Sequence, residues 1–231
     1  EYDGKVLDAV NSYFGLRSVA LTERKFLING KSVFGRWVLD QGFYPDGIYT
    51  APTDEALKAD IDRSIELGFN GARLHQKIFE PRFLYWADKL GYLVWGEHGN
   101  WGIDYTDLAQ IRNWLPEWME SVVRDFNHPA LIGWCPFNET WNRHGRQQSD
   151  DIIRLCYEVT KAMDPTRPVI DTSGNFHVGE HTDIFDIHDY DQNVETYTER
   201  IGKGVFVTFK DRQSWHGQPF FVSEYGGIQW S

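Results

Sequence analysis

The chain of 231 residues is long enough for one large domain or two small ones. Hydrophobic residues make up 41% of it, enough for a sizeable core, so a disordered chain is excluded. The formal net charge of −11 argues against nucleic acid or an anionic membrane as a partner, because both need a basic face.

The first part of the chain has the pattern of a small antiparallel β unit. Residues from about 12 to 33 alternate between apolar and polar side chains, and Asn29-Gly30 is a strong signal for a hairpin turn. This unit has too little sequence for a hydrophobic core of its own, so we expect it to belong to a larger domain.

From residue 33 onward, apolar strand patterns alternate with amphipathic helix patterns. Helices are expected after Thr53, Pro81, Pro116 and Ser149 and over residues 194–202, with Gly68 and Gly91 as stop signals. Strands are expected over residues 33–39, 69–74, 92–95, 131–137, 169–171, 184–187 and 220–223. The apolar, non-alternating strands predict a parallel sheet covered by helices.

The count of strands favours a closed barrel over an open sheet. A TIM (β/α)8 barrel, an α/β fold, has eight strands and typically about 250 residues. We count seven strands, so we expect a barrel that lacks its last βα unit, which would follow Ser231. An open doubly wound sheet is the alternative, although no glycine-rich phosphate loop follows the first strand. A strand order that reverses partway would identify that alternative.

Each predicted strand ends in polar, mostly ionisable residues. In a barrel these ends meet on one face, where the active sites of this fold lie. Burying so many polar groups together costs free energy unless they pair. Among these ends, Glu139 and Glu224 each follow an apolar run, and a pair of carboxylates is what hydrolysis of a glycosidic bond requires. The strand-end residues are Asp40, Gln41, Arg73, His75, Glu97, His98, Asn138, Glu139, Asp171, His188, Asp189, Tyr190, Glu224 and Tyr225.

Five short motifs, in this order and spacing, carry a resemblance to known enzymes. They are residues 69–73 (FNGAR), 92–97 (YLVWGE), 127–134 (NHPALIGW), 138–139 (NE) and 223–225 (SEY). From about residue 12 to 231 the chain resembles glycoside hydrolase family 2, the β-galactosidase, β-glucuronidase and β-mannosidase group. The resemblance implies that residues 1–32 are the C-terminal remnant of an immunoglobulin-like β-sandwich. It also implies that residues 33–231 are the catalytic barrel, truncated after strand seven.

The resemblance also implies roles for individual residues. Glu139 matches the acid/base and Glu224 the nucleophile of a retaining, exo-acting β-glycosidase that forms a covalent glycosyl-enzyme. Glu139 must then start protonated and Glu224 ionised, and Arg73 would hold Glu224 as a carboxylate. Asn138 would hydrogen-bond the sugar 2-hydroxyl. Further expected substrate-binding residues are Asp40, His75, Trp141, His188, Tyr190, Tyr225 and Trp230.

Other functions and other sugars stay open at this point. Galactose is the default by family frequency, while glucuronate would need a cationic or Asn/Lys pocket and mannose is a further alternative. A non-catalytic sugar-binding protein would predict a missing carboxylate. A metal-dependent hydrolase is a more remote alternative, because successive strand residues face opposite sides and the ligands would not all converge. Its ligands would come from His181, Asp183, Asp186, His188, Asp189 and Asp191.

The expected partner is therefore a carbohydrate substrate, with no nucleic acid, membrane, metal or cofactor. No apolar run is long enough to cross a bilayer and no signal-peptide pattern opens the sequence, so the compartment stays open. Only Cys135 and Cys156 are present, which predicts no disulfide framework. A homo-oligomer, formed through parts outside this chain, is compatible with these patterns.

Overall fold

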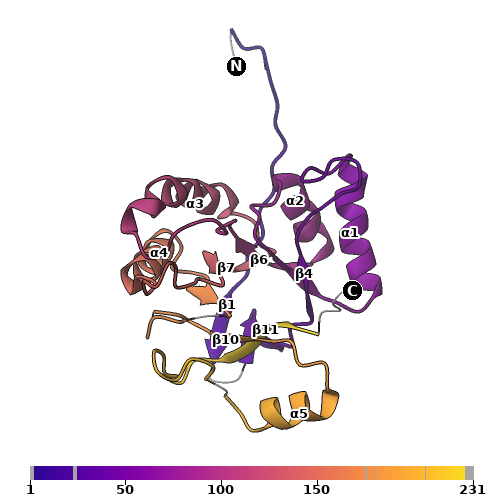
Figure 1. Cartoon of the computed structure of the whole chain (residues 1–231). Coiled ribbons are helices and arrows are strands. Elements are labelled where there is room, and N and C mark those ends of the chain that lie inside the picture. The colour runs from indigo at the N-terminus through magenta and orange to yellow at the C-terminus, as the bar shows by residue number, and fades with distance from the viewer. Residues whose placement is uncertain (1–2, 23–24, 175, 180, 206, 227–231) are drawn as a thin grey trace.

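The structure is a computed structural model that describes residues 3–22, 25–174, 176–179, 181–205 and 207–226 (Figure 1). No helix among these residues is long and apolar enough to cross a membrane. The elements in chain order are β1 (Val19–Thr22), β2 (Lys25–Ile28), β3 (Lys31–Val33), β4 (Trp37–Asp40), α1 (Asp54–Glu66), β5 (Gly71–Leu74), α2 (Pro81–Leu90), β6 (Leu93–Glu97), the 3-10 helix η1 (Leu108–Gln110), α3 (Ile111–Asp125), β7 (Leu131–Cys135), β8 (Phe137–Asn138), α4 (Asp150–Met163), β9 (Thr172–Ser173), β10 (Phe185–Asp189), α5 (Val194–Gly202) and β11 (Phe220–Tyr225).

The strands from β4 onward form a parallel series in sequence order. A four-stranded sheet has the order β4-β5-β6-β7, and each neighbouring pair in it is parallel. A parallel bridge between Trp134 and Val169 and the parallel pairs β8–β9 and β10–β11 continue the series. The order never reverses among the described strands, so the barrel-type α/β fold is confirmed and the doubly wound alternative is wrong. The expected absence of an eighth βα unit stays a prediction.

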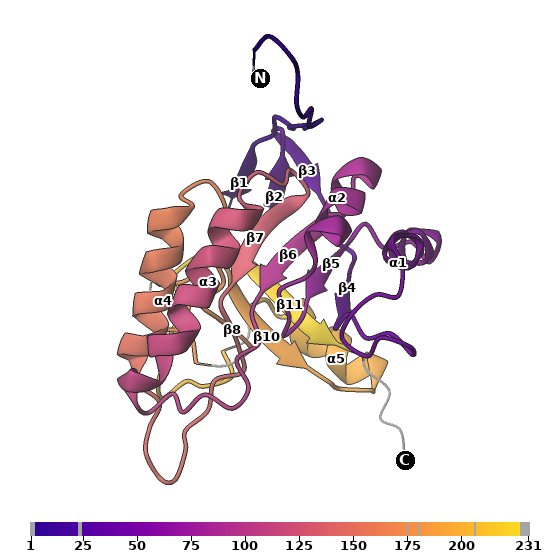
Figure 2. The same cartoon turned by 90° about the horizontal axis from the view of Figure 1, so that it is seen from above.

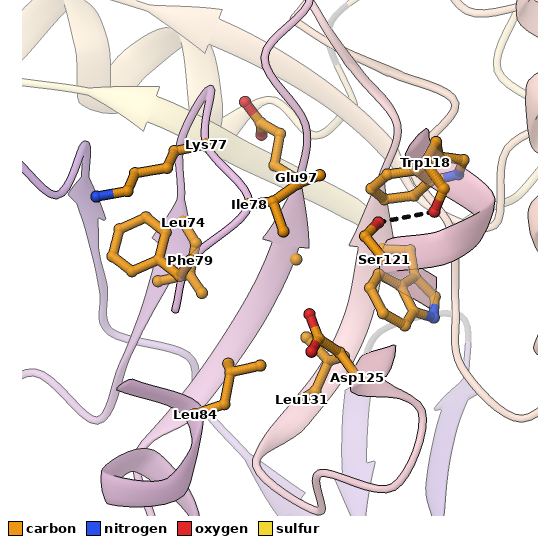
Figure 3. Close-up of a pocket in the computed structure, with 12 residues that line it drawn as sticks. Leu74, Lys77, Ile78, Phe79, Leu84, Glu97, Trp118, Ser121, Asp125 and Leu131 are labelled. Carbon is orange, nitrogen blue, oxygen red and sulfur yellow. Dashed lines mark hydrogen bonds between the residues drawn. The ribbon is translucent and has the colours of Figure 1, made fainter. Parts of the chain in front are cut away.

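The helices lie outside this series of strands (Figures 1 and 2). α1 packs against α2, and α3 packs against α4. Their inner faces join the main core through buried side chains such as Ile61, Phe83, Trp118 and Ile153. A cavity in this layer, whose lining residues are drawn in Figure 3, has a volume of about 10 Å3 and is no larger than one water position. The Glu97 carboxylate at its edge points away from the helices, toward the strand tips.

Most local signals in the sequence act as predicted. The Thr53 hydroxyl accepts a hydrogen bond from the backbone of α1, and Pro81 is the first residue of α2. Gly91 ends α2 with a φ of 70°. One helix start is wrong: α3 begins at Ile111, with Pro116 inside it. Ile111, Trp114 and Trp118 are buried on one face, and this packing outweighs the helix-breaking tendency of the proline.

The N-terminal β unit closes one end of the barrel. β1, β2 and β3 form an antiparallel sheet with the predicted turn at Asn29-Gly30. Figure 2 shows this sheet at the amino-terminal end of the parallel strands, opposite their tips. Phe26 lies 5.9 Å from Trp37 and 6.3 Å from Trp95, ring centre to ring centre. Because the sheet shares its apolar core with the barrel, an immunoglobulin-like remnant is not confirmed, and the boundary at residue 32 stays a prediction.

Candidate active site

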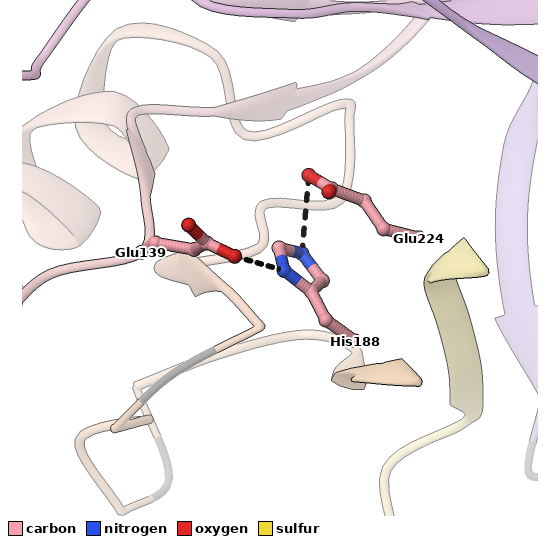
Figure 4. Close-up of side chains that lie close together, drawn as sticks. All are labelled: Glu139, His188 and Glu224. Atoms are coloured by element: carbon pink, nitrogen blue, oxygen red, sulfur yellow. Dashed lines mark hydrogen bonds and ion pairs between the residues drawn. The ribbon is translucent and has the colours of Figure 1, made fainter. Parts of the chain in front are cut away.

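The structure brings the two strand-end glutamates together. Glu139 follows β8, and Glu224 lies near the end of β11. One carboxylate oxygen of each and one nitrogen of His188 lie within 4.8 Å of one another (Figure 4). Glu139 has a φ of 46°, a sparsely populated value for a residue with a side chain. Its backbone N–H donates to the Ser173 carbonyl at 2.9 Å, which holds this conformation.

Arg73 ties the ends of three other strands together. Its Nε donates to Glu97 at 2.8 Å, its Nη1 to Glu224 at 2.8 Å and its Nη2 to Asn138 at 2.5 Å. Burial alone would lower the pKa of Arg73, but Glu97 and Glu224 raise it above the usual range. Arg73 is therefore a buried cation beside Glu224.

Glu97 is a predicted strand-end residue that is not among the expected site residues. It is buried at the end of β6, where one oxygen accepts from Arg73 and the other from the Gln76 backbone at 2.9 Å. His75 Nδ1 lies 3.0 Å from Glu97. Burial would raise the pKa of Glu97, but Arg73 and His75 lower it overall. The sequence signal for Glu97 as a buried partner of Arg73 is its place at a strand end in the YLVWGE motif.

His188 lies between the two glutamates of the site. Its Nδ1 is 2.6 Å from a Glu139 oxygen and its Nε2 is 3.3 Å from a Glu224 oxygen (Figure 4). The hydrogen bond with His188 lowers the pKa of Glu139, which is the reverse of what a lone general acid needs. Tyr190 donates its hydroxyl hydrogen to Glu224, and burial together with this bond raises the pKa of Tyr190.

Asn138 has one hydrogen-bonding group to spare. Its side-chain oxygen accepts from Arg73, and its backbone N–H donates to Asn100 at 3.0 Å. The residue is buried, and its side-chain Nδ2 has no hydrogen-bond partner among the described residues. A buried donor without a partner costs free energy, so a ligand hydroxyl at this point would be stabilised.

Some of the expected substrate-binding residues lie away from the pair. Asp40 accepts a hydrogen bond from the Gly42 backbone at 2.8 Å, and no described contact joins it to the glutamates. Tyr225 is 60% exposed, and its ring lies beside Tyr197. Trp141 is exposed and shares with Glu139 a cavity of about 480 Å3. Trp230 lies outside the described residues.

The residues proposed as metal ligands do not converge. Asp183 pairs with Lys161, and Asp189 and Asp191 pair with Arg200. Among the described residues, the acidic and histidine side chains that are close enough together to hold an ion are Glu139, His188 and Glu224.

This trio has hydrogen-bonding rather than metal-binding geometry. Two tetrahedral zinc ligands with bonds of about 2.1 Å would lie about 3.4 Å apart. The 2.6 Å separation between His188 and Glu139 is that of a hydrogen bond.

A barrel of parallel βα units with paired carboxylates at its strand tips is the architecture of a glycosidase catalytic domain. The model of the TIM barrel domain of glycosyl hydrolases family 2 matches residues 19–229. The chain belongs to glycosyl hydrolase family 2.

Relatives and solved structures agree with this family. A β-glucuronidase from Chlorocebus aethiops is 27% identical over 235 residues, covering 96% of this chain and 35% of that protein. A β-glucuronidase from Canis lupus familiaris is 28% identical over 236 residues, with the same coverage. This chain thus spans about a third of the length of these relatives.

Solved structures show the same fold. A β-D-glucuronidase from Dictyoglomus thermophilum has a TM-score of 0.77 at 19% identity, covering 94% of this chain and 40% of that one. A family 2 β-galacturonidase from Eisenbergiella tayi, bound to galacturonate, has a TM-score of 0.75 at 20% identity, covering 92% and 39%.

Proposed function

We propose that this domain carries the catalytic residues of a retaining β-glycosidase, with Glu224 as nucleophile and Glu139 as acid/base. The observation that supports this most is the spacing of the two carboxylates, whose nearest oxygens lie within 4.8 Å. Retaining enzymes hold their carboxyl groups about 5–5.5 Å apart, whereas inverting enzymes leave about 6.5–9.5 Å for a water molecule.

The proposed reaction has two steps. Glu224 attacks the anomeric carbon as the glycosidic bond breaks, and Glu139, as the acid/base, delivers a proton to the departing oxygen. The Glu139 carboxylate then takes a proton from the water that releases the sugar from Glu224. Arg73 and Tyr190 donate hydrogen bonds to Glu224, and these bonds direct its oxygens before attack.

Two features favour binding of a sugar beside this pair. The free Nδ2 of Asn138 is a donor for a ring hydroxyl, in line with the family resemblance, which points to the 2-hydroxyl. The cavity beside Glu139 has Trp101 and Trp141 on its wall, and both side chains are more than half exposed. Because the leaving group departs on the acid/base side, this cavity is where the aglycone would lie.

For the sugar we propose a β-linked uronide, with glucuronide first. This replaces galactose as the default, because the curated relatives at 27 and 28% identity are β-glucuronidases. A uronate carboxylate needs a cation or several donors in its pocket. Arg73 cannot serve, since Glu97 and Glu224 already use it. The uronate would therefore be recognised by another residue.

The test is a panel of nitrophenyl β-glycosides assayed with the wild-type protein and two variants. Glu224→Gln should reduce kcat on the preferred glycoside by at least about 10³-fold, because no covalent intermediate forms. Glu139→Ala should lose activity mainly on alkyl glycosides and retain it on dinitrophenyl glycosides, whose leaving groups need no proton.

The control for folding is the thermal unfolding midpoint of each variant. Near-normal turnover by Glu224→Gln would refute its assignment as nucleophile. Within the same panel, the glucuronide should have the highest kcat/KM. A higher value for the galactoside would refute the uronide proposal and leave the glycosidase proposal standing.

A further inference from the structure

A continuous chain of polar contacts leads from the barrel interior to Glu139. His177 is buried, with Nδ1 2.5 Å from Asp171 and Nε2 3.0 Å from Asp186. Asp186 accepts a hydrogen bond from Ser173 at 2.7 Å, and the Ser173 hydroxyl lies 3.1 Å from Nε2 of His188. The other nitrogen of His188 faces the acid/base carboxylate.

The directions of these hydrogen bonds follow from the charge of Asp186. Burial alone would raise its pKa, but hydrogen bonding and the charge of His177 lower it to about 2. Asp186 is therefore a carboxylate that only accepts. Both the Ser173 and the Ser223 hydroxyls donate to it. The Ser173 hydrogen is thus used, and its oxygen faces His188 as an acceptor.

These hydrogen-bond directions show that Nε2 of His188 carries a hydrogen. Among the described residues, the polar groups that contact Nε2 are the Ser173 oxygen and a Glu224 oxygen, and both are acceptors. Nε2 therefore carries a hydrogen. The 2.6 Å contact between Nδ1 and Glu139 then contains one further proton, which belongs either to the imidazole or to the carboxyl group.

We propose that His188 is a positioning residue that shares this proton with Glu139, so that the pair, rather than Glu139 alone, is the proton donor of the reaction. The inference rests on the proposed glycosidase activity. As the glycosidic bond breaks, the shared proton moves to the leaving oxygen, and the pair becomes a carboxylate beside a neutral imidazole. In the second step the pair regains one proton from the attacking water, the water oxygen bonds to the anomeric carbon, and the bond from that carbon to Glu224 breaks and leaves a carboxylate.

The charges around the pair support a stored proton. Glu224 lies on the Nε2 side of His188, with Arg73 behind it, and Asp186 lies beyond Ser173. The Tyr190 hydroxyl lies 3.5 Å from Nδ1 of His188, but its hydrogen goes to Glu224.

Charged groups farther from His188 also contribute to the electrostatic field at the pair. Glu97 and His75 pair with each other and with Arg73, and His177 pairs with Asp171 and Asp186. Arg73 thus pairs with two carboxylates, Glu97 and Glu224, while Glu139 pairs with His188, and the excess of carboxylates around His188 favours a proton within the pair.

The first test is the pH dependence of kcat/KM for His188→Asn, which keeps a short polar side chain. Without the stored proton, the donor is Glu139 alone. The alkaline limb of the kcat/KM profile, where activity falls as the donor loses its proton, should therefore move to lower pH by at least about one pH unit. Alkyl glycosides should lose more activity than dinitrophenyl glycosides.

The matched control is His128→Asn, at a partly buried histidine that pairs with Asp88 and has no described contact with Glu139, Glu224 or Arg73. It should leave the alkaline limb in place. An unchanged limb in His188→Asn, with only KM raised, would overturn the proposal and make His188 an ordinary sugar ligand.

A second readout does not need turnover. Carbon-13 NMR of glutamate-labelled protein, in the Glu224→Gln background, follows the Glu139 carboxyl group directly. Replacing His188 should move the Glu139 titration to higher pH, because the hydrogen bond that lowers its pKa is lost. The carboxyl titration and the rate limb should therefore move in opposite directions, which is the signature of a shared proton.

An unchanged Glu139 titration in His188→Asn, repeated in His188→Gln, would refute the sharing even if the protein proved inactive on every glycoside. Conversely, an inactive protein with the expected shift of the titration would refute the glycosidase proposal and leave the shared proton intact.

Discussion

The arrangement of the site depends on the planar shape of one guanidinium group. Arg73 directs three different nitrogen atoms at Glu97, Asn138 and Glu224, which come from β6, β8 and β11. A fork of fixed geometry can satisfy three acceptors at once, whereas an ammonium group is a single point. The position of Glu224, the proposed nucleophile, is therefore set by Arg73 as much as by the strand that carries it.

This geometry predicts the result of a conservative substitution. Arg73→Lys keeps the charge but should lower kcat by about 10²-fold, because Glu224 loses its alignment with the anomeric carbon. Steady-state kinetics on the preferred nitrophenyl glycoside would measure the change. The exposed Arg82, which pairs only with acidic side chains at the surface, is the control, and Arg82→Lys should be neutral. Equal kinetics for the two variants would contradict this role for Arg73.

At the scale of elements, the strands approach one another closely where glycine replaces a side chain. A Cβ atom at Gly71 in β5 would lie 2.0 Å from the Leu93 carbonyl oxygen in β6 and 2.7 Å from the Trp37 ring in β4. Gly91 at the end of α2 has no atom within 4 Å of such a position and requires only its φ of 70°. The two glycines therefore serve different purposes: the first permits strand pairing and the second ends a helix.

The difference can be measured by urea unfolding. Gly71→Ala should lower the free energy of unfolding by about 2–3 kcal/mol, because the strands on both sides must move apart. Gly91→Ala should cost about 1 kcal/mol, from the strained backbone alone. A smaller loss for Gly71→Ala than for Gly91→Ala would show that β4, β5 and β6 do not pair at this distance.

At the scale of the whole molecule, buried ionised groups link stability to pH. The folded state lowers the pKa of Asp186 to about 2 from its ordinary 3.8, so this stabilisation is complete above pH 3.8 and is lost as the pH falls toward 2. The folded state raises the pKa of His177 well above 6.5, because Asp171 and Asp186 outweigh the effect of burial. That stabilisation is complete below pH 6.5 and is lost as the pH rises through the folded value.

The thermal unfolding midpoint should therefore be highest between about pH 4 and 6.5 and decline on both sides. His177→Gln removes the cation and should lower the midpoint most within this range and least at alkaline pH. His144→Gln, at an exposed position, is the control and should leave the profile unchanged. A uniform loss at every pH in His177→Gln would show that His177 contributes packing rather than charge.

The sequence by itself determined the βα alternation, the helix caps at Thr53 and Gly91, the hairpin turn, and the two strand-end glutamates. These features rest on local signals, since caps, turns and apolar periodicity act within a few residues of the chain. The start of α3 was missed because the burial of Trp114 and Trp118 depends on distant strands, which no local pattern reveals.

Only the tertiary structure decided which polar groups meet. Asp40 and Arg73 both come from strand ends, yet Arg73 contacts Glu224 and Asp40 does not. The pairing of Glu97 with Arg73 and the place of His188 between the two glutamates likewise depend on strands far apart in the chain. Proton affinity is set by such neighbours and by burial, so the lowered pKa of Glu139 could not be read from a motif.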